Sequence, residues 1–304
     1  MANHVSVNKN AVKLLGTQRM RAINESFSKY KKTVGGDKRG ELMQMFRAPK
    51  TMPKDMLARG LCEILVDIGA SDAEKKAAAM LNAMIVLAKQ GAQLDDLELK
   101  CKLFLAGEVP NLQDEVRRAL SGRTDIIVNQ IAGFLEGKSI LDLGTGDGKV
   151  GAALARRGFS VSLADVLDFR APEAKNIRFE KYDGKTLPFG NKSVDNVLLL
   201  TVLHHADEAI RVFEEAVRVA RNRIIVIESV YFNNEHRKLN MFLDWFYNRV
   251  IHNNVNCPFN FQSPSGWEST FSKFGFNVLG SRDLGVDQRV VPEYHWLYAL
   301  EVPK

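Results

Sequence analysis

A strand that runs directly into three alternating glycines is the feature that most constrains this chain. The segment reads Ser139-Ile-Leu-Asp-Leu-Gly-Thr-Gly-Asp-Gly-Lys149. Glycine lets the chain turn sharply after a strand and brings its backbone against a ligand where a Cβ would collide. A helix predicted from about Lys149 to Arg157, ended by Gly158, points its N-terminal amides toward the same place. The pattern predicts a loop that binds a nucleotide-type ligand.

The spacing of the glycines distinguishes between the known classes of nucleotide-binding loop. The dinucleotide fingerprint is G-x-G-x-x-G, whereas Gly144, Gly146 and Gly148 give G-x-G-x-G. The loop also lacks the Gly-Lys-Ser/Thr triplet of a Walker loop. Asp142 lies two residues before the first glycine, where a carboxylate suits a cationic group and opposes a phosphate. The loop therefore favours a ligand with an amino group or a sulfonium centre beside an adenosine.

From Asp142 to Gly148 the chain resembles motif I of class I S-adenosylmethionine-dependent methyltransferases, in their small-molecule (type 11-like) subgroup. The resemblance continues downstream in the family's order, through 160–165, 182–195 and 198–205, and covers roughly residues 123–230. It implies a Rossmann-like α/β fold with a doubly wound, mostly parallel sheet and a C-terminal antiparallel hairpin. It also implies a methyltransferase that uses S-adenosyl-L-methionine as donor and leaves S-adenosyl-L-homocysteine as product.

The resemblance also assigns the residues that hold the donor. Asp165 would accept hydrogen bonds from both ribose hydroxyls, since a carboxylate offers two acceptor oxygens. Asp183 would accept from the adenine amino group, and the Gly184 amide would donate to the ring. The complete predicted donor site comprises Asp142, Gly144, Thr145, Gly146, Asp165, Val166, Asp183, Gly184 and Leu200. Arg123 is a candidate for binding the donor's carboxylate through its guanidinium fork, with a surface role as the alternative.

Strands and helices alternate from Ser139 onward, as a doubly wound sheet requires. The ligand of such a sheet lies beyond the carboxyl ends of the strands, where Asp142, Asp165, Asp183 and the pair His204-His205 would all project. Asp207 is expected to cap the helix after the fourth strand. The predicted strands are 140–143, 161–164, 177–179, 197–200 and 224–227, followed by a hairpin of 276–280 and 295–300.

Methyl transfer from a sulfonium is an in-line displacement, in which the protein aligns the reactants, excludes water and for some acceptors removes a proton. His205, directly after the fourth strand, is the first candidate base, because an imidazole titrates near neutral pH. His295 and Glu293 are the next candidates. The alternative is that these residues only shape the loop and the hairpin. Three further candidates rank below them: Asp244, His252 and His236. No His/Cys/Asp cluster has zinc-like spacing, so no metal is expected.

The chain of 304 residues is long enough for two domains. Residues 1–120 are predicted to form a helical accessory domain for substrate capping or for dimer formation, and residues 121–304 the catalytic domain. Within the latter, an insertion at about 228–267 is rich in aromatic residues. We interpret it as a lid over the pocket of an apolar or aromatic methyl acceptor, with simple packing onto the sheet edge as the alternative.

Residues 1–60 contain thirteen basic and four acidic residues, although the whole chain has a net charge of only +6. A basic segment can attract nucleic acid or an anionic membrane surface, but these residues can equally line solvated helix faces. Two alternatives to a small-molecule enzyme therefore stay open: an RNA or protein methyltransferase, and a non-catalytic binding module. No apolar run is long enough for a transmembrane segment, no signal core is present, and the three cysteines are unpaired in sequence, so a cytoplasmic location is expected.

Overall fold

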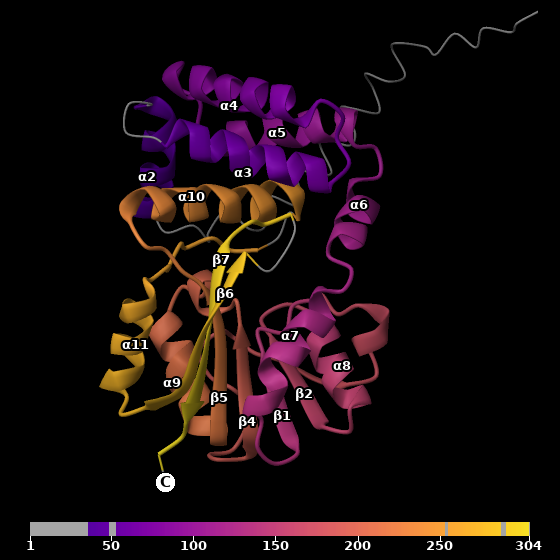
Figure 1. Cartoon of the computed structure of the whole chain (residues 1–304), viewed down its shortest axis with the longest axis vertical. Coiled ribbons are helices and arrows are strands. Elements are labelled where there is room, and N and C mark those ends of the chain that lie inside the picture. Colours follow the sequence, from indigo (N-terminus) through magenta and orange to yellow (C-terminus); the bar gives the residue numbers. More distant parts are fainter. Residues whose placement is uncertain (1–35, 49–52, 253–254, 287–289, 304) are drawn as a thin grey trace, which may run out of the picture. The chain divides into compact units, whose positions relative to one another are not determined.

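The computed structural model describes residues 36–48, 53–252, 255–286 and 290–303. Residues 35–304 form one compact unit. In the described part of residues 36–120 the regular elements are helices, as the sequence predicts (Figure 1). They are α2 (Gly36–Arg47), α3 (Lys54–Asp67), α4 (Ala73–Lys89), α5 (Leu94–Glu108) and α6 (Leu112–Ala119). The greater part of the basic N-terminal segment lies outside the described residues.

The remainder of the chain alternates strands with helices. The parallel part contains α7 (Arg123–Ile131), β1 (Ser139–Leu143), α8 (Lys149–Arg156), β2 (Ser160–Asp165), β3 (Arg178–Lys181), β4 (Val194–Leu200), α9 (Ala209–Val219) and β5 (Ala220–Ser229). After the parallel part, the chain continues with α10 (Asn234–Trp245), a π-helical turn η5 (Phe246–Ile251), α11 (Pro264–Lys273), β6 (Asn277–Val286) and β7 (Tyr294–Glu301). Short 3₁₀ turns of the described residues are η2 (Ala132–Phe134), η3 (Pro172–Ala174) and η4 (Leu203–His205).

The strands form one seven-stranded sheet in the order β3-β2-β1-β4-β5-β7-β6. β1 to β5 pair in parallel, whereas β7 is antiparallel to both β5 and β6. Parallel strands buried on both faces are expected to be continuously apolar, as Ile224-Ile-Val-Ile227 is. The predicted Rossmann-like sheet with its closing hairpin is confirmed.

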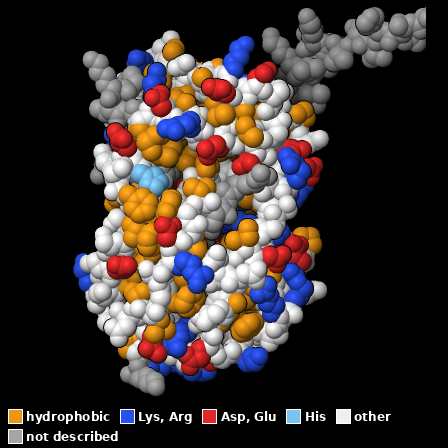
Figure 2. Space-filling view, in the orientation of Figure 1, with side chains coloured by type: hydrophobic (Ala, Val, Ile, Leu, Met, Phe, Trp, Pro, Cys, Tyr) orange, Lys and Arg blue, Asp and Glu red, His pale blue; other side chains and the backbone are white. Residues whose placement is uncertain are grey.

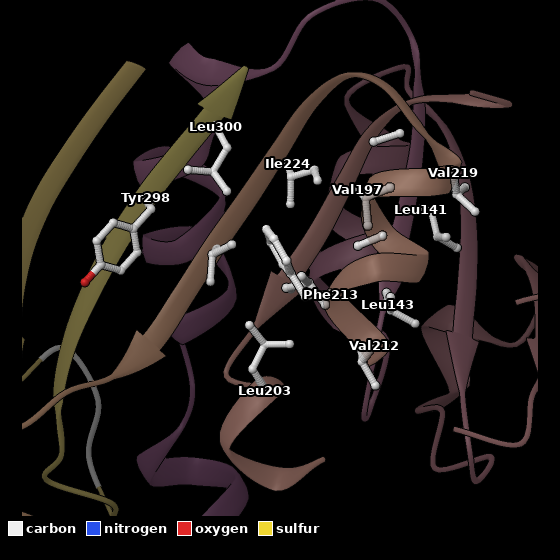
Figure 3. Close-up of a cluster of buried hydrophobic side chains, with 14 of the residues drawn as sticks. Leu141, Leu143, Val197, Leu203, Val212, Phe213, Val219, Ile224, Tyr298 and Leu300 are labelled. Carbon is white, nitrogen blue, oxygen red and sulfur yellow. The ribbon is translucent and has the colours of Figure 1, made fainter. Parts of the chain in front are cut away.

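Alternate residues of the central strands face two hydrophobic cores, because side chains along a strand alternate between faces. On one face, Leu141, Val197 and Ile224 pack against Val212 and Phe213 of α9 (Figure 3). The neighbouring strand residues turn to the opposite face, where they meet α7 and α8. That second cluster includes Ile127, Ile131, Ile140, Leu154, Leu198 and Ile225. The two cores fix the strands, so the positions of their carboxyl ends are rigid.

The N-terminal helices pack on α10 and η5, near the carboxyl ends of the parallel strands (Figure 1). Phe46 of α2 contacts the rings of Phe242 and Trp245. The indole Nε1 of Trp245 donates to Glu98 Oε1 of α5 at 2.9 Å, and the same carboxylate forms a buried ion pair with Arg249 at 3.3 Å. These helices are therefore joined to α10 and η5 by both apolar and ionic contacts.

One predicted helix cap is wrong. The helix after β4 begins at Ala209 with Glu208 at its N-cap, and no side chain caps it. Asp207 instead accepts a hydrogen bond from Asn256 Nδ2 at 2.7 Å. The tertiary contact with the 255–263 segment therefore replaces the local cap.

Candidate active site

The glycine turn after β1 is held against β2 and against the loop after β4. The amides of Gly144 and Thr145 both donate to the carbonyl of Ala164, at 2.8 and 3.2 Å. Gly144 has φ +73°, and a Cβ there would lie 2.6 Å from both methyl carbons of Val202. Only glycine fits this position, because a side chain would meet both the positive φ and the valine.

Asp165, at the end of β2, faces this turn. Its carboxylate accepts from the amides of Gly146 (2.9 Å), Val166 (2.7 Å) and Leu167 (3.3 Å). Burial raises the pKa of Asp165, while these amides act in the opposite direction. A carboxylate has about four lone-pair directions, so acceptor capacity is left for a ligand hydroxyl.

Asp142 of β1 lies beside Asp165 and is almost fully buried. Thr145 Oγ1 donates to its Oδ2 at 2.8 Å. Burial raises the pKa of Asp142 to about 6, and the charge of Asp165 adds to that increase, although the hydrogen bond from Thr145 opposes it. A cationic ligand next to this pair of carboxylates would relieve the cost of keeping both ionised.

The third predicted carboxylate follows β3, the strand next to β2. Asp183 is fully exposed and accepts from the amides of Lys185 and Thr186, both at 2.8 Å, and these bonds lower its pKa. Gly184 has φ +81°, and Val166 lies 3.5 Å from the position of its absent Cβ. The strand ends therefore bring together Asp142, Gly144, Thr145, Gly146, Asp165 and Val166, with Asp183 and Gly184 at the next tip.

Two other predicted donor residues lie at the borders of this region. Leu200 is the last residue of β4 and is half-buried. Arg123 is the first residue of α7, and its charge lowers the pKa of both Tyr247 and Glu293, although burial is the larger influence on each. Its buried Nε has no hydrogen-bond partner among the described residues. Arg123 is half-buried and lies within electrostatic reach of Tyr247 and Glu293.

The loop after β4 is organised by Glu228, the last residue but one of β5. Thr201 adopts φ +58°, and the amides of Val202 and Leu203 then donate to Glu228 Oε1 at 2.9 and 2.6 Å. Its other oxygen bonds His204 Nδ1 at 2.5 Å. Burial raises the pKa of Glu228 to about 7 and lowers the pKa of His204 to about 4. Because two amides favour the carboxylate, we assign the shared proton to Nδ1 of a neutral His204.

His205 connects the loop after β4 to Asn256 and to Asp244 of α10. Its Nδ1 lies 2.8 Å from the carbonyl oxygen of Asn256, which can only accept, so Nδ1 carries the proton. Its Nε2 lies 3.6 Å from Asp244 Oδ1 of α10. Burial lowers the pKa of His205 and His204 lowers it further, while Asp244 raises it.

Glu293 and His295 lie at the neighbouring end of β7. The hydroxyl of Ser229 donates to Glu293 Oε2 and lies 3.2 Å from His295 Nε2. All three residues are buried, and burial together with the charge of Asp244 raises the pKa of Glu293 well above its usual value. Glu293 Oε1 has no partner within the described part of the chain. The structure thus places all three predicted catalytic residues, His205, His295 and Glu293, beside the ends of β4, β5 and β7.

The segment of α10 and η5 presents different faces to the sheet and to the N-terminal helices. Asn240, Asp244 and Asn248 recur every four residues, which puts them on one buried polar face. The aromatic residues Phe242 and Trp245 contact Phe46 instead. The aromatic wall expected from this helix is thus engaged in packing, and Phe261, stacked 5.0 Å from His204, supplies the ring that borders the site.

Two lower-ranked candidates lie elsewhere. His236 stacks on the exposed ring of Phe232, and His252 is exposed beside Tyr247. Asp244, by contrast, lies in the site beside His205. Glu228 was not identified as a site residue from the sequence. The signal for Glu228 was an acidic residue directly after an apolar strand, the same signal that indicates Asp142 and Asp165. A further convergence was not expected from the sequence: ligand atoms of His204, His205 and Asp244 all lie within 4.8 Å of one another.

Comparison with known proteins agrees with this geometry. Residues 113–280 match the family model of the methyltransferase domain. No curated protein matches the chain in sequence. Solved structures to which the chain is similar include a SAM-dependent methyltransferase from Aquifex aeolicus, with 17% identity, 62% of this chain and 93% of that chain covered, and a TM-score of 0.43. Another is magnesium protoporphyrin IX methyltransferase from Synechocystis PCC 6803 with bound SAH, at 17% identity, 64% and 88% coverage and a TM-score of 0.46.

The family model spans more than half of the chain, and its range includes the glycine turn and the ends of β1 to β5. The expectation of a non-catalytic binding module is therefore set aside. The chain belongs to the methyltransferase domain family and is a methyltransferase.

Proposed function

We propose that the enzyme methylates a small molecule with an apolar or aromatic part, held between the ends of β4, β5 and β7 and the polar face of α10. The observation that carries this proposal is the burial of the groups around the reaction centre. His204, Glu228, Asp244, Glu293 and His295 are each at most 2% exposed. A small molecule can be enclosed among such groups, whereas a folded macromolecule would need them at an open surface.

A groove beside the site supports a small acceptor. It has a volume of about 670 Å³, within the range of small-molecule sites. Phe261 lines this groove and also stacks on His204, so a single ring separates the groove from the reaction centre. The other lining residues include Lys38, Asp207, Arg211, Arg237, Phe259 and Gln262.

In the proposed arrangement, the donor lies along the ends of β1, β2 and β3. Asp165 accepts from the ribose hydroxyls and Asp183 from the adenine amino group. Asp142 and the turn from Gly144 to Gly146 face the methionyl part, and Arg123 binds its carboxylate. This placement directs the sulfonium methyl toward the loop after β4.

The reaction requires the acceptor atom to attack the methyl carbon in line with the carbon–sulfur bond. The acceptor's electron pair forms the new bond, and sulfur keeps the pair of the broken bond and becomes a neutral thioether. A proton on the acceptor passes to His205 or to the Glu293–Ser229–His295 group. Burial suits His205 to the task, because it lowers the pKa of the imidazole, whose neutral form can accept a proton, and because it excludes water.

The N-terminal helices have a proposed role in closing this site. Their contacts with Trp245 and Arg249 hold α10 in position, which supports capping. Dimer formation through the same helices is the competing role, and exposed Val66, Val86 and Leu103 are available for it. Sedimentation analysis of the purified chain separates the two.

Free thiols at all three cysteines fit the proposed cytoplasmic location. None of the described helices has the length and apolar character that crossing a bilayer requires.

The test is a transfer assay with donor that carries a deuterated methyl group. Enzyme and labelled donor are incubated separately with the small-molecule, RNA and protein fractions of a cell extract. We expect the mass shift in the small-molecule fraction, with little dependence on salt. Labelled RNA or protein instead, with transfer that falls steeply as salt rises, would favour the alternative acceptors. Acidic and basic side chains are mixed on the face in Figure 2, which does not favour that alternative.

A further inference from the structure

The contact between His205 and Asp244 is not a hydrogen bond. Its 3.6 Å separation is beyond hydrogen-bond distance. Because His205 Nδ1 donates to the Asn256 carbonyl, Nε2 directs a lone pair toward a carboxylate oxygen. Two electron-rich atoms face each other in a buried place, an arrangement that is unfavourable unless a positive charge or a donor lies between them.

A second observation concerns the other oxygen of the same carboxylate. Asp244 is 1% exposed, and its Oδ1 accepts from Asn248 Nδ2 at 2.7 Å. Its Oδ2 has no hydrogen-bond partner among the residues that the structure describes. A buried carboxylate oxygen without a partner is costly, so this atom calls for a ligand.

The two histidines also have the supporting contacts of metal ligands. A ligating imidazole nearly always donates its other N–H to a carboxylate or a backbone carbonyl, which fixes the tautomer and the ring orientation. His204 has Glu228 in this role, and His205 has the carbonyl of Asn256. Both rings therefore keep Nε2 available, and the two ring centroids are 4.0 Å apart.

The spacing fits a transition metal. Atoms bound at about 2.0 to 2.2 Å in tetrahedral geometry lie about 3.3 to 3.6 Å from each other. The separation of His205 Nε2 from Asp244 Oδ1 is 3.6 Å, and ligand atoms of all three residues lie within 4.8 Å of one another. Two imidazoles and one carboxylate suit zinc, cobalt or ferrous iron, whereas magnesium prefers oxygen ligands and water.

From these contacts we propose that His204, His205 and Asp244 form a binding site for one divalent transition-metal ion. Three protein ligands leave at least one coordination position for another molecule, as in catalytic rather than structural sites. Val202 of the same loop lies against Gly144 of the glycine turn, so the ion would lie near the donor. If the ion holds the acceptor, it lowers the pKa of a bound hydroxyl, and His205 then serves as a ligand in place of a free base. This consequence rests on the proposed function, but the binding of the ion does not.

The experiment measures binding of Zn²⁺ and Co²⁺ to the full chain after removal of metals with a chelator. We expect one equivalent of Zn²⁺ by calorimetry, a visible absorption band on addition of Co²⁺, and no comparable binding of Mg²⁺. Asp244→Asn and His205→Gln should each weaken Zn²⁺ binding about 100-fold or more, and Glu228→Gln about 10-fold through the orientation of His204. His236→Gln is the matched control, because this histidine lies outside the cluster, and its affinity should equal that of the unaltered protein.

S-adenosylhomocysteine binding by the same samples reports whether each variant is folded. If Asp244→Asn fails to fold, His205→Gln decides. Absence of stoichiometric uptake by protein that binds S-adenosylhomocysteine would overturn the metal site, as would uptake that is unchanged in both ligand variants. Metal uptake without any binding of S-adenosylhomocysteine would instead contradict the donor assignment and leave the metal site standing.

Discussion

The donor side and the acceptor side of this active site are built in different ways. Apart from Arg123 and Leu200, the proposed donor side lies between Asp142 and Gly184, and its carboxylates at Asp165 and Asp183 are already bonded by nearby backbone amides. The acceptor side joins residues as distant as His204, Asp244 and Glu293, and several of its buried polar atoms have no partner among the described residues. Local hydrogen bonds can shape a loop before a ligand arrives, whereas buried atoms without partners indicate a place that a ligand completes.

The largest effect is expected where the acceptor side is anchored to the N-terminal helices. Glu98→Ala removes the acceptor of Trp245 Nε1 and the partner of the buried Arg249. Breaking a buried ion pair by removing one partner costs about 3 to 5 kcal/mol, and urea unfolding would measure this loss. Because local backbone amides hold Asp165 and Asp183 of the donor side, S-adenosylhomocysteine should still bind below the unfolding transition. Equal loss of donor binding and of transfer would show that the two sides are not separate.

A smaller effect is expected where the two sides touch. Gly144→Ala places a Cβ against Val202, on the acceptor side, in a backbone conformation with positive φ. Strain and overpacking together predict a loss of about 2 to 5 kcal/mol. Gly146→Ala is the control, since its φ is also positive but nothing lies within 4 Å of the added carbon, so about 1 kcal/mol is expected.

Chemical denaturation measures the free energy of unfolding of Gly144→Ala and Gly146→Ala. The difference between their two losses is the part caused by the contact with Val202. The double substitution Gly144→Ala with Val202→Ala should recover part of the loss, because it removes the two methyl groups involved. Equal destabilisation by the two glycine variants would mean that the turn does not depend on the loop after β4.

The smallest effect is expected at Asp142, the buried carboxylate of the donor side. Its substitution should raise the free energy of unfolding, whereas the substitutions above lower it. The pKa of Asp142 is raised to about 6, above an unfolded value of about 3.9, so ionisation between these pH values costs stability. Asp142→Asn should therefore increase the free energy of unfolding by about 1 to 3 kcal/mol at pH 7.5 and change it little at pH 4, where both side chains are neutral. Donor affinity should fall at the same time.

Thermal unfolding at the two pH values, with calorimetry of S-adenosylhomocysteine at pH 7.5, makes the comparison. Destabilisation of the same size at both pH values would show that Asp142 has a structural role without a charge cost.

The same contrast explains what the sequence could predict. The glycine turn, Asp165 and the apolar strands are local patterns, and each was found because its signal lies within a few residues. The roles of Glu228 and Asp244 depend on β5 and α10 folding over the loop after β4. The prediction that Asp207 caps α9 is wrong for the same reason, since Asn256, about fifty residues away in sequence, donates a hydrogen bond to that side chain. Periodicity assigned the aromatic residues to α10 but could not say that they face the N-terminal helices.

The most direct test of the account is calorimetry of S-adenosylhomocysteine with two neighbouring aspartate variants. Asp165→Ala removes the acceptor proposed for both ribose hydroxyls, and hydrogen bonds to a charged group contribute about 1.5 to 3 kcal/mol each. Asp168→Ala removes the same charge three residues away, from an exposed carboxylate that pairs with Arg170 and Lys175. We expect Asp165→Ala to weaken binding about 100-fold or more while Asp168→Ala leaves it within about twofold of the unaltered protein. Unchanged affinity in Asp165→Ala, or equal losses in both variants, would contradict the donor site at the ends of β1, β2 and β3.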